Sequence, residues 1–547
     1  MQFHPVAMAA TSNPDTMYFD QGMRQPDSEQ FVHAVIKEVN DHISRKHWEL
    51  VPRSAVPKDV AILPSVWSLK RKRDIKSRQV YKWKARLNVH GGRQVHGINY
   101  WETFSPVVTW ITIRILLILT ILNKWYSRQV DFVLAFPQAK IETDMYMELP
   151  RGIEMAHGNG KTRVLKLLKN LYGQKQAGRI WNLHLKDKLL KIGFTQSKFD
   201  ECLFYRGDVI FVVYVDDGIF VSPSDQHITD AINELKQQKL DIEDQGDLND
   251  YLGVNVTTLK NGDIKLSQPH LIEQIIDESK VNLKLSMKQT PANSSKILTP
   301  DLEGQNFNGK FNYRSIIGRL NFLEKSTRPD LAYAVHQCAR FSANPKVSHG
   351  KAIEHIVHYL RNTKDDGIIL KPDSDKAIEA YADADFAGNW NKVEAPFDSN
   401  TARSRTGYLI TFLGCPITWC SKLQTTIALS STEAEYVALS HSMRDVIPMM
   451  GLLKEMKHFG FDVRTTDPRI HCKAFEDNMG AIELSKLPKL RPRTKHINIV
   501  YHHFREFVTN ELIKIFPIRT EDQQADIFTK PLPQNLFLKL RKRISGF

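Results

Sequence analysis

The chain has 547 residues, of which 42% are apolar and 25% are charged. These proportions exclude a disordered chain and a membrane-embedded one, and the length predicts about three or four domains. The formal net charge of +14 favours an anionic partner such as nucleic acid. The five cysteines are too scattered for a disulfide framework or a zinc knuckle, and we expect each of them to be a small residue of the core. They are Cys202, Cys338, Cys415, Cys420 and Cys472.

No segment of the sequence predicts a membrane span or export. The longest aliphatic run, Ile111 to Leu122, contains Arg114 and is too short to cross a bilayer of about 30 Å. We expect it to form a buried helix. The N-terminal residues lack the charged and then apolar layout of a secretory signal, so we expect the protein to stay inside the cell.

In chain order, the first 30 residues show no sustained hydrophobic period and predict a poorly ordered lead-in. Apolar residues at Phe31, Val35, Val39 and Ile43 then follow the spacing of an amphipathic helix. From Ile62 short apolar runs alternate with basic ones, which predicts the strands of a basic lobe.

The middle of the chain carries alternating strand, hairpin and helix signals. They predict a strand over 125–136, a helix over 180–192, a hairpin over 207–223, a hairpin at Asn261-Gly262, a helix over 270–279 and a linker over 280–310. Residues 313–362 predict helices with breaks at Pro329 and Pro345, because proline interrupts a helix. A β-rich unit with one long helix follows Gly367, and the basic end predicts a solvated tail.

Asp216 and Asp217 form the tip of a predicted hairpin, between the apolar runs FVVYV and GIFV. Two adjacent carboxylates in an apolar setting repel each other strongly without a cation. Phosphodiester formation by two metals requires carboxylates that hold Mg²⁺ ions about 3.5 to 4 Å apart. Asp131 ends another strand-like segment and can face this tip. The alternative is a solvated Asp-Asp turn, and the apolar strands on both sides favour the metal site.

Several motifs occur in a fixed order: VYKWKARLNVHGG, ETFSPVV, QVDFVLAFPQA, MYMELPRGI, LKNLYGQKQAGRIW, YVDD and YLGV. From about residue 26 to its end, the chain resembles the reverse transcriptase portion of copia-type long-terminal-repeat retrotransposon Pol polyproteins. The resemblance implies an α+β right-hand polymerase (fingers, palm, thumb) followed by an α/β ribonuclease H-like domain. The expected parts are a lead-in over 1–30, fingers and palm over 31–260, thumb and helix-rich connection over 261–370, the ribonuclease H-like domain over 371–535 and a basic tail over 536–547.

The resemblance also implies roles for residues of the polymerase. The implied metal ligands are the carboxylates of Asp131, Asp216 and Asp217 and the backbone carbonyl of Phe132. Lys84 and Arg86 are implied to grip the nucleotide triphosphate, and Phe136 to exclude the ribonucleotide 2′-hydroxyl. The other implied dNTP contacts are Gly173, Lys175, Gln176, Tyr214 and Val215. The family usually has Leu and Pro where this chain has Gln174 and Gly178, which alters the wall of the site.

A second acidic set follows the Asp, Glu, Asp, Asp order of ribonuclease H, whose two-metal chemistry uses water as the nucleophile. Its members are Asp383, Glu433, Asp477 and Asp526. Asp385 and Glu435 remain alternatives, and the family pattern favours Asp383 and Glu433. Glu433 also fits a helix-capping box that begins at a preceding serine.

The stretch RPRTKHINIVYHHFRE matches the same family pattern. Its implied contacts with the hybrid backbone are Arg491, Arg493, Lys495 and His496. Its histidines lack acidic or cysteine partners at ligand spacing and therefore do not predict zinc. Many ribonucleases H have a mobile histidine shortly before the last aspartate, but no histidine follows His503 here, so we expect product release to differ.

We therefore expect RNA-directed DNA synthesis from dNTPs, coupled to cleavage of RNA in RNA-DNA hybrids. The expected cofactors are two Mg²⁺ ions per site, with Mn²⁺ as a substitute. The expected partners are an RNA template, a DNA primer and the hybrid, with no membrane. The alternative is a decayed or domesticated copy that binds nucleic acid without catalysis.

The sequence shows neither a protease-like Asp-Thr/Ser-Gly segment nor an integrase-like zinc region, so we expect only the downstream part of a Pol polyprotein. We expect the protein in the cytoplasm, in virus-like particles, or in the nucleus. The run from Lys70 to Arg73 is either a nuclear localisation signal or a strand that binds phosphate, and we favour the strand.

Overall fold

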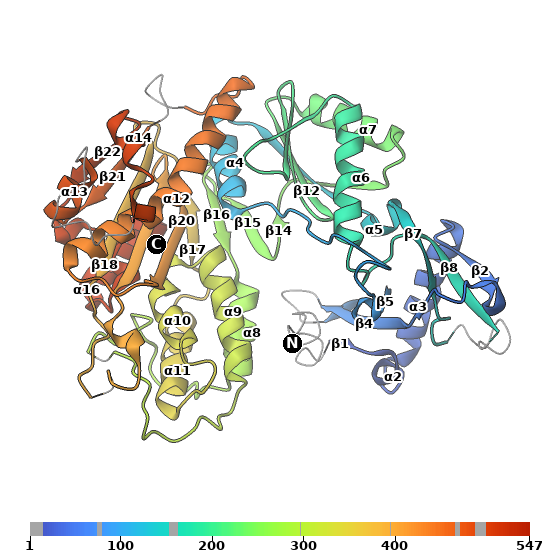
Figure 1. The fold of residues 1–547 in the computed structure, drawn as a ribbon, viewed down its shortest axis with the longest axis horizontal. Helices are drawn as coiled ribbons and strands as arrows, with labels where there is room; N and C mark the ends of the chain where they lie inside the picture. Colours follow the sequence, from blue (N-terminus) through green and yellow to red (C-terminus); the bar gives the residue numbers. More distant parts are fainter. Residues whose placement is uncertain are drawn as a thin grey trace.

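The computed structural model describes residues 15–73, 79–152, 162–295, 297–393, 395–464, 471–486 and 499–547. These residues form five β-sheets with helices packed around them. Figure 1 shows the blue fingers at one end of the molecule and, at the other, the orange and red ribonuclease H-like unit that follows residue 370, called the nuclease unit below. The predicted fold class, a right-hand α+β polymerase followed by an α/β ribonuclease H-like unit, is confirmed. No helix in the described part of the chain has the length and apolar character to cross a membrane.

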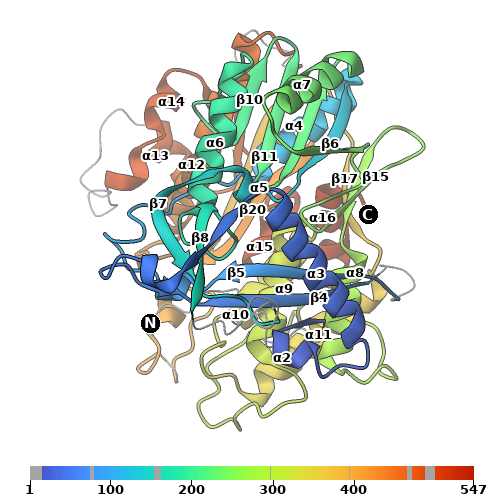
Figure 2. The same ribbon diagram turned by 90° about the vertical axis from the view of Figure 1, so that its right-hand side faces the viewer.

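The fingers consist of two sheets and helix α3 (Ser28–Ser44), which lies across β5 (Figure 2). The first sheet has the order β1 (Thr16–Met17), β4 (Ser65–Arg73), β5 (Val80–Val89), and the second β2 (Trp48–Pro52), β8 (Arg163–Lys169), β7 (Lys140–Met147), β3 (Ile62–Leu63). Helix α3 buries Phe31, Val35 and Val39, as its spacing predicts, whereas Ile43 stays 53% exposed.

The described part of the predicted lead-in is folded, which corrects that expectation. Strand β1 pairs with β4, and helix α2 (Phe19–Gly22) follows it. Arg71 and Arg73 of β4 form ion pairs with Asp27 (2.6 Å) and Asp15 (2.8 Å). The basic run from Lys70 to Arg73 therefore belongs to a paired strand. Residues 1–14 lie outside the described residues.

The palm is a six-stranded sheet with the predicted acidic hairpin near its centre. Its strand order is β13 (Ile242–Gly246), β6 (Tyr126–Phe132), β12 (Asp217–Ser222), β11 (Val209–Tyr214), β10 (Leu203–Arg206), β9 (Thr195–Gln196). Its helices are α4 (Trp110–Asn123), α5 (Ala135–Gln138), α6 (Ala177–Lys191) and α7 (Asp225–Gln237). The buried helix predicted from the aliphatic run is confirmed as α4, which is apolar almost all round because it is covered on most sides.

The thumb and connection combine a four-stranded sheet with four helices. The strands are β14 (Asp250–Tyr251), β15 (Val254–Thr258), β16 (Ile264–Ser267) and β17 (Gly367–Leu370), and the helices are α8 (Pro269–Ser279), α9 (Tyr313–Ser326), α10 (Ala332–Ala339) and α11 (Val347–Asn362). The predicted Asn261-Gly262 turn joins β15 to β16, and the predicted proline breaks separate α9, α10 and α11. Residue 260, the predicted boundary, falls inside this sheet.

The nuclease unit is a mixed five-stranded sheet flanked by helices. Its strand order is β20 (Cys415–Leu423), β19 (Arg405–Phe412), β18 (Ile378–Asp385), β21 (Cys472–Glu476), β22 (Ile513–Pro517). Its helices are α12 (Ser431–His458), α13 (Met479–Lys486), α14 (Arg505–Thr509), α15 (Asp526–Thr529) and α16 (Gln534–Ser545). The predicted solvated tail is instead mostly α16, because Phe537, Leu540 and Ile544 share one buried face.

The palm, the connection and the nuclease unit meet around Arg114 of α4. Its fully buried guanidinium donates to the backbone carbonyls of Ile417 in β20 and Ser326 at the end of α9. The guanidinium carbon lies 4.4 Å from the ring centroid of Trp419 in β20. Burial lowers the pKa of Arg114 to about 9. One palm side chain therefore contacts both neighbouring units.

A second contact joins the palm to the far end of α12. The Glu455 carboxylate accepts hydrogen bonds from the backbone amide of Lys198 (2.8 Å) and the Tyr205 hydroxyl (3.2 Å). The Tyr205 ring stacks on Phe459, with centroids 4.5 Å apart. The nuclease unit is thus packed on the palm at two separate places.

Candidate active sites

Two neighbouring strands of the palm bring the first acidic group together. Asp131, near the end of β6, is the Cα partner of Asp217, the first residue of β12. Tyr214 pairs with Asp217 across the hairpin, which leaves Val215 and Asp216 as a two-residue turn. The Phe132 amide donates to the Asp216 carbonyl (2.9 Å). The structure therefore brings Asp131, Asp216 and Asp217 together at the same end of two central strands, as the sequence predicts.

The hairpin turn is held in a strained shape by residues far away in the chain. Val215 has φ +57°, which is unfavourable for a β-branched residue. The Trp181 indole donates to the Val215 carbonyl (2.6 Å), and the Tyr251 hydroxyl donates to the Asp217 carbonyl (3.2 Å). A Cβ at Gly218 would lie 2.7 Å from the Phe211 ring, so only glycine fits beneath the turn. Sequence patterns did not identify Trp181 or Tyr251, because neither contact is local.

The acidic side chains of the palm repel one another. Burial and the charge of Asp216 raise the pKa of Asp131, and burial with Asp216 and Asp131 raises the pKa of Asp217 to about 6. Lys84 and Lys72 act in the opposite direction on Asp131. Burial and, after it, the positive charge of Arg86 lower the pKa of Lys84. Two lysines of the fingers thus lie near the palm carboxylates, and Lys72 was not among the predicted site residues.

An aromatic cluster lies beside these lysines. The Arg86 guanidinium carbon is 3.8 Å from the ring centroid of Tyr172, and the Phe136 ring centroid is 5.0 Å from it on a tilted plane. Tyr172 was not predicted, although it begins the YGQKQAG motif. The structure places predicted Arg86 and predicted Phe136 against the same ring.

The rest of the YGQKQAG motif is held by contacts with the fingers. Gly173 has φ +87°, and a Cβ there would lie 2.2 Å from the Val89 carbonyl oxygen, so its close approach is to β5. The buried Gln176 accepts from the Gln94 side chain (3.0 Å). Lys175 donates to the Tyr100 hydroxyl (3.1 Å). These bonds fix the motif to the fingers, and the nucleotide contacts of Gly173, Lys175 and Gln176 stay a prediction.

The second acidic group lies in the nuclease unit. Single carboxylate oxygens of Asp383, Glu435 and Asp477 all lie within 4.8 Å of one another. Asp383 comes from β18, Glu435 from the first turns of α12, and Asp477 directly follows β21. Asp526 at the start of α15 interacts with Asp383, and burial with the Asp383 charge raises its pKa to about 7. Of the alternatives Asp383 and Asp385, Asp383 is the member of this close group.

Of the alternatives Glu433 and Glu435, the structure places Glu435 in this close group. The Glu433 carboxylate accepts from the Leu429 amide (2.7 Å), and its own amide donates to the Ser430 hydroxyl (3.1 Å). Ser430 is therefore the N-cap of α12, and the Glu433 carboxylate reaches back to the residue before that cap. Two residues later, the helix has turned by about 200°, so the Glu435 side chain points to β18 instead. Capping and metal binding both favour an acidic residue here, which is why the sequence left the choice open.

A fifth carboxylate enlarges the nuclease group. Glu476 is fully buried, and its Oε2 has no hydrogen-bond partner among the described residues. Burial and, after it, the negative charge of Glu476 raise the pKa of Glu435 to about 11. The Thr529 hydroxyl donates to the Asp383 carboxylate, and Lys530 forms an ion pair with Asp526 (2.9 Å). Such a dense set of buried acids is costly unless a cation neutralises it.

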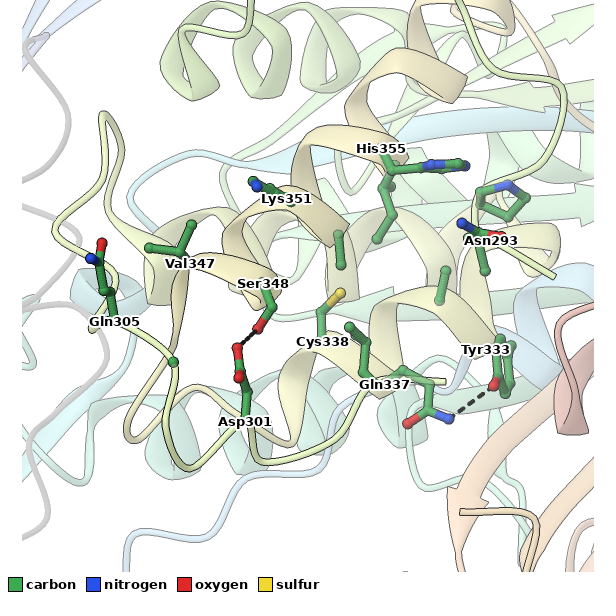
Figure 3. Close-up of a pocket in the computed structure, with 17 residues that line it drawn as sticks. Asn293, Asp301, Gln305, Tyr333, Gln337, Cys338, Val347, Ser348, Lys351 and His355 are labelled. Atoms are coloured by element: carbon green, nitrogen blue, oxygen red, sulfur yellow. Dashed lines mark hydrogen bonds between the residues drawn. The ribbon is translucent and has the colours of Figure 1, made fainter. Parts of the chain in front are cut away.

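Other features lie apart from these groups. Arg491, Arg493, Lys495 and His496 lie outside the described residues. A cavity of about 500 Å³ lies between α10, α11 and the loop before α9 (Figure 3). On its wall the Gln337 amide donates to the Tyr333 hydroxyl (2.9 Å). None of the predicted site residues that the structure describes lines this cavity.

Known proteins resemble this chain over most of its length. The family model "Reverse transcriptase (RNA-dependent DNA polymerase)" matches residues 45–293. The Retrovirus-related Pol polyprotein from transposon RE1 of Arabidopsis thaliana is 33% identical over 545 residues, or 98% of this chain and 35% of that protein. The putative transposon Ty5-1 protein of Saccharomyces cerevisiae is 30% identical over 322 residues, which cover 58% of this chain and 100% of the yeast protein.

Among solved structures, a foamy viral protease-reverse transcriptase in complex with double-stranded DNA has a TM-score of 0.48 and 12% identity, covering 89% of this chain and 69% of that one. The chain spans about a third of the length of the plant polyproteins that match nearly all of it. The family model and the full coverage of the yeast protein show that the chain belongs to the reverse transcriptases of copia-type retrovirus-related Pol polyproteins.

Proposed function

We propose that this chain synthesises DNA from dNTPs on an RNA or DNA template and cleaves the RNA strand of the resulting hybrid. One observation carries the proposal: a member of the reverse transcriptase family holds two separate carboxylate groups, one at a palm hairpin and one in a nuclease-like sheet. Carboxylate oxygens are ligands that Mg²⁺ prefers, and Mn²⁺ accepts the same ligands. Two Mg²⁺ ions bound in each group would activate the attacking oxygen and stabilise the leaving one.

The residues of each group have distinct tasks under this proposal. In the palm, Asp131, Asp216 and Asp217 hold the cations, and the fixed Val215 turn keeps their spacing. Lys84 and Arg86 bind the triphosphate, and the Phe136 ring blocks a ribose 2′-hydroxyl. In the nuclease unit, the cations are held by Asp383, Glu435, Asp477 and Asp526. The basic residues around Arg491 contact the hybrid backbone.

Primer extension tests the proposal directly. The purified chain is expected to extend oligo(dT) on poly(rA) with dTTP and Mg²⁺, and chelation or Asp216→Asn is expected to remove the incorporation. Folded, soluble protein that incorporates nothing would refute polymerase activity and favour the alternative of a nucleic-acid binder without catalysis. Equal incorporation by Asp216→Asn would show that the polymerase site lies elsewhere.

The effect of Mg²⁺ on stability is expected to depend on pH. Asp217 and Asp526 have pKa values raised from 3.8 to about 6 and about 7. The folded protein thus binds these protons more tightly than the unfolded chain, so their contribution to stability is fully present below about pH 4 and is lost as the pH rises from there to about 7. Mg²⁺ binds the deprotonated carboxylates. The increase in the unfolding midpoint that Mg²⁺ produces should therefore be larger at about pH 8 than at about pH 5. Thermal unfolding with Mg²⁺ or EDTA measures this, and a gain independent of pH contradicts it.

A further inference from the structure

A cation from the chain itself lies at the nuclease carboxylates. The Lys530 Nζ is 2.9 Å from Asp526 Oδ1 and 3.9 Å from Asp383 Oδ2. The Lys530 side chain is 37% exposed, whereas both carboxylates are 4% exposed. The ammonium group therefore approaches the two buried acids from their solvent side.

One short segment builds this arrangement. Helix α15 begins with Asp526, and the Thr529 hydroxyl of the same helix donates to Asp383. Lys530 directly follows the helix, with an extended backbone (φ −140°, ψ 157°), and its amide donates to the Asp526 carbonyl (3.3 Å). Residues 526–530 thus supply an acid, a hydroxyl donor and a cation to the same place, so the position of Lys530 is set by the helix end.

A fixed positive charge near several carboxylates has two opposite effects. It reduces the repulsion between them in the metal-free protein, and it repels any divalent cation that they bind. We propose that Lys530 is a positioning residue that holds Asp383 and Asp526 together before metal binding and weakens the affinity of the site for its second divalent cation.

This inference rests on the proposed nuclease function and addresses one of its steps. If the second cation is weakly held, the Lys530 ammonium group would restore the charge balance of Asp383 and Asp526 once the products leave. No histidine follows His503 in this sequence. We therefore assign to Lys530 the assistance of product release that a histidine near the last aspartate would otherwise give.

Mn²⁺ titration by calorimetry tests the role of Lys530. The parent protein is the full chain with Asp216→Asn and Asp217→Asn, so that binding reports on the nuclease group. Lys530→Met is expected to bind the weaker Mn²⁺ ion about tenfold more tightly and to unfold at a lower temperature in EDTA. Lys530→Arg keeps the charge and should match the parent protein.

Lys191→Met is the matched control, because Lys191 forms an i,i+4 ion pair with Asp187 (2.6 Å) on the exposed face of α6. It should leave Mn²⁺ affinity unchanged. Equal or weaker Mn²⁺ binding by Lys530→Met and Lys530→Gln overturns the inference. If Asp477→Asn leaves the Mn²⁺ titration of the parent protein unchanged, the proposed nuclease site itself fails, so the two failures are distinguishable.

Discussion

Glu435→Gln is expected to reduce cleavage of RNA in a hybrid by about 10³-fold or more. Glu435 shares a group with Asp383 and Asp477 in which the ligand oxygens lie within 4.8 Å of one another. Gln keeps the shape of the side chain and removes its negative charge. A metal site contributes several kcal/mol to the transition state, and each loss of about 1.4 kcal/mol is a factor of ten in rate.

Glu433→Gln is the matched control for this substitution, two residues away in the same helix. Gln keeps an oxygen that accepts from the Leu429 amide, so cleavage should stay within about threefold and the unfolding midpoint should change little. Single-turnover cleavage of end-labelled RNA annealed to DNA gives both rates, and primer extension by the same samples reports intact folding. Loss of cleavage in Glu433→Gln with normal cleavage in Glu435→Gln would reverse the assignment.

Asp131→Asn is expected to lower single-nucleotide incorporation by about 10³-fold while hybrid cleavage stays near its normal rate. Asp131 is the Cα partner of Asp217 across two central strands, so its loss removes one side of the palm group. The nuclease carboxylates belong to a different sheet and keep their neighbours. A variant with selective loss of one activity would show that the two sites work separately.

Asp225→Asn serves as the control within the palm. Asp225 is half-exposed and forms an ion pair with Arg128, away from the hairpin tip. Surface ion pairs contribute about 1 kcal/mol or less, so incorporation should stay within about twofold. Rapid-quench measurement with one dNTP separates incorporation from primer binding. Equal losses in both variants would mean that the palm sheet as a whole, and not the Asp131 carboxylate, is sensitive to substitution.

Local signals in the sequence predicted the elements that carry the chemistry. The apolar runs on both sides of Asp216 predicted the hairpin, and the Asn261-Gly262 turn predicted the next one, because both depend on neighbouring residues. Strand β1 was missed, since two residues carry no period and its partner lies more than 50 positions away. The long-range hydrogen bond from Trp181 to Val215 was missed for the same reason.

The sequence could place an acid at the start of α12 but could not choose between two. The choice depends on where β18 lies relative to the helix, which only the tertiary structure determines. In the same way, the sequence could not identify Tyr172 as a site residue, because its contact with Arg86 depends on how the fingers fold.

The contacts of Arg114 and Glu455 fix the nuclease unit on the palm. Under the proposed function, a duplex whose primer end lies at Asp131 would reach Glu435 after a constant number of base pairs. Cleavage at Glu435 would then follow each added nucleotide at the same interval, and the length of RNA left uncut would report how rigidly this junction holds the two units.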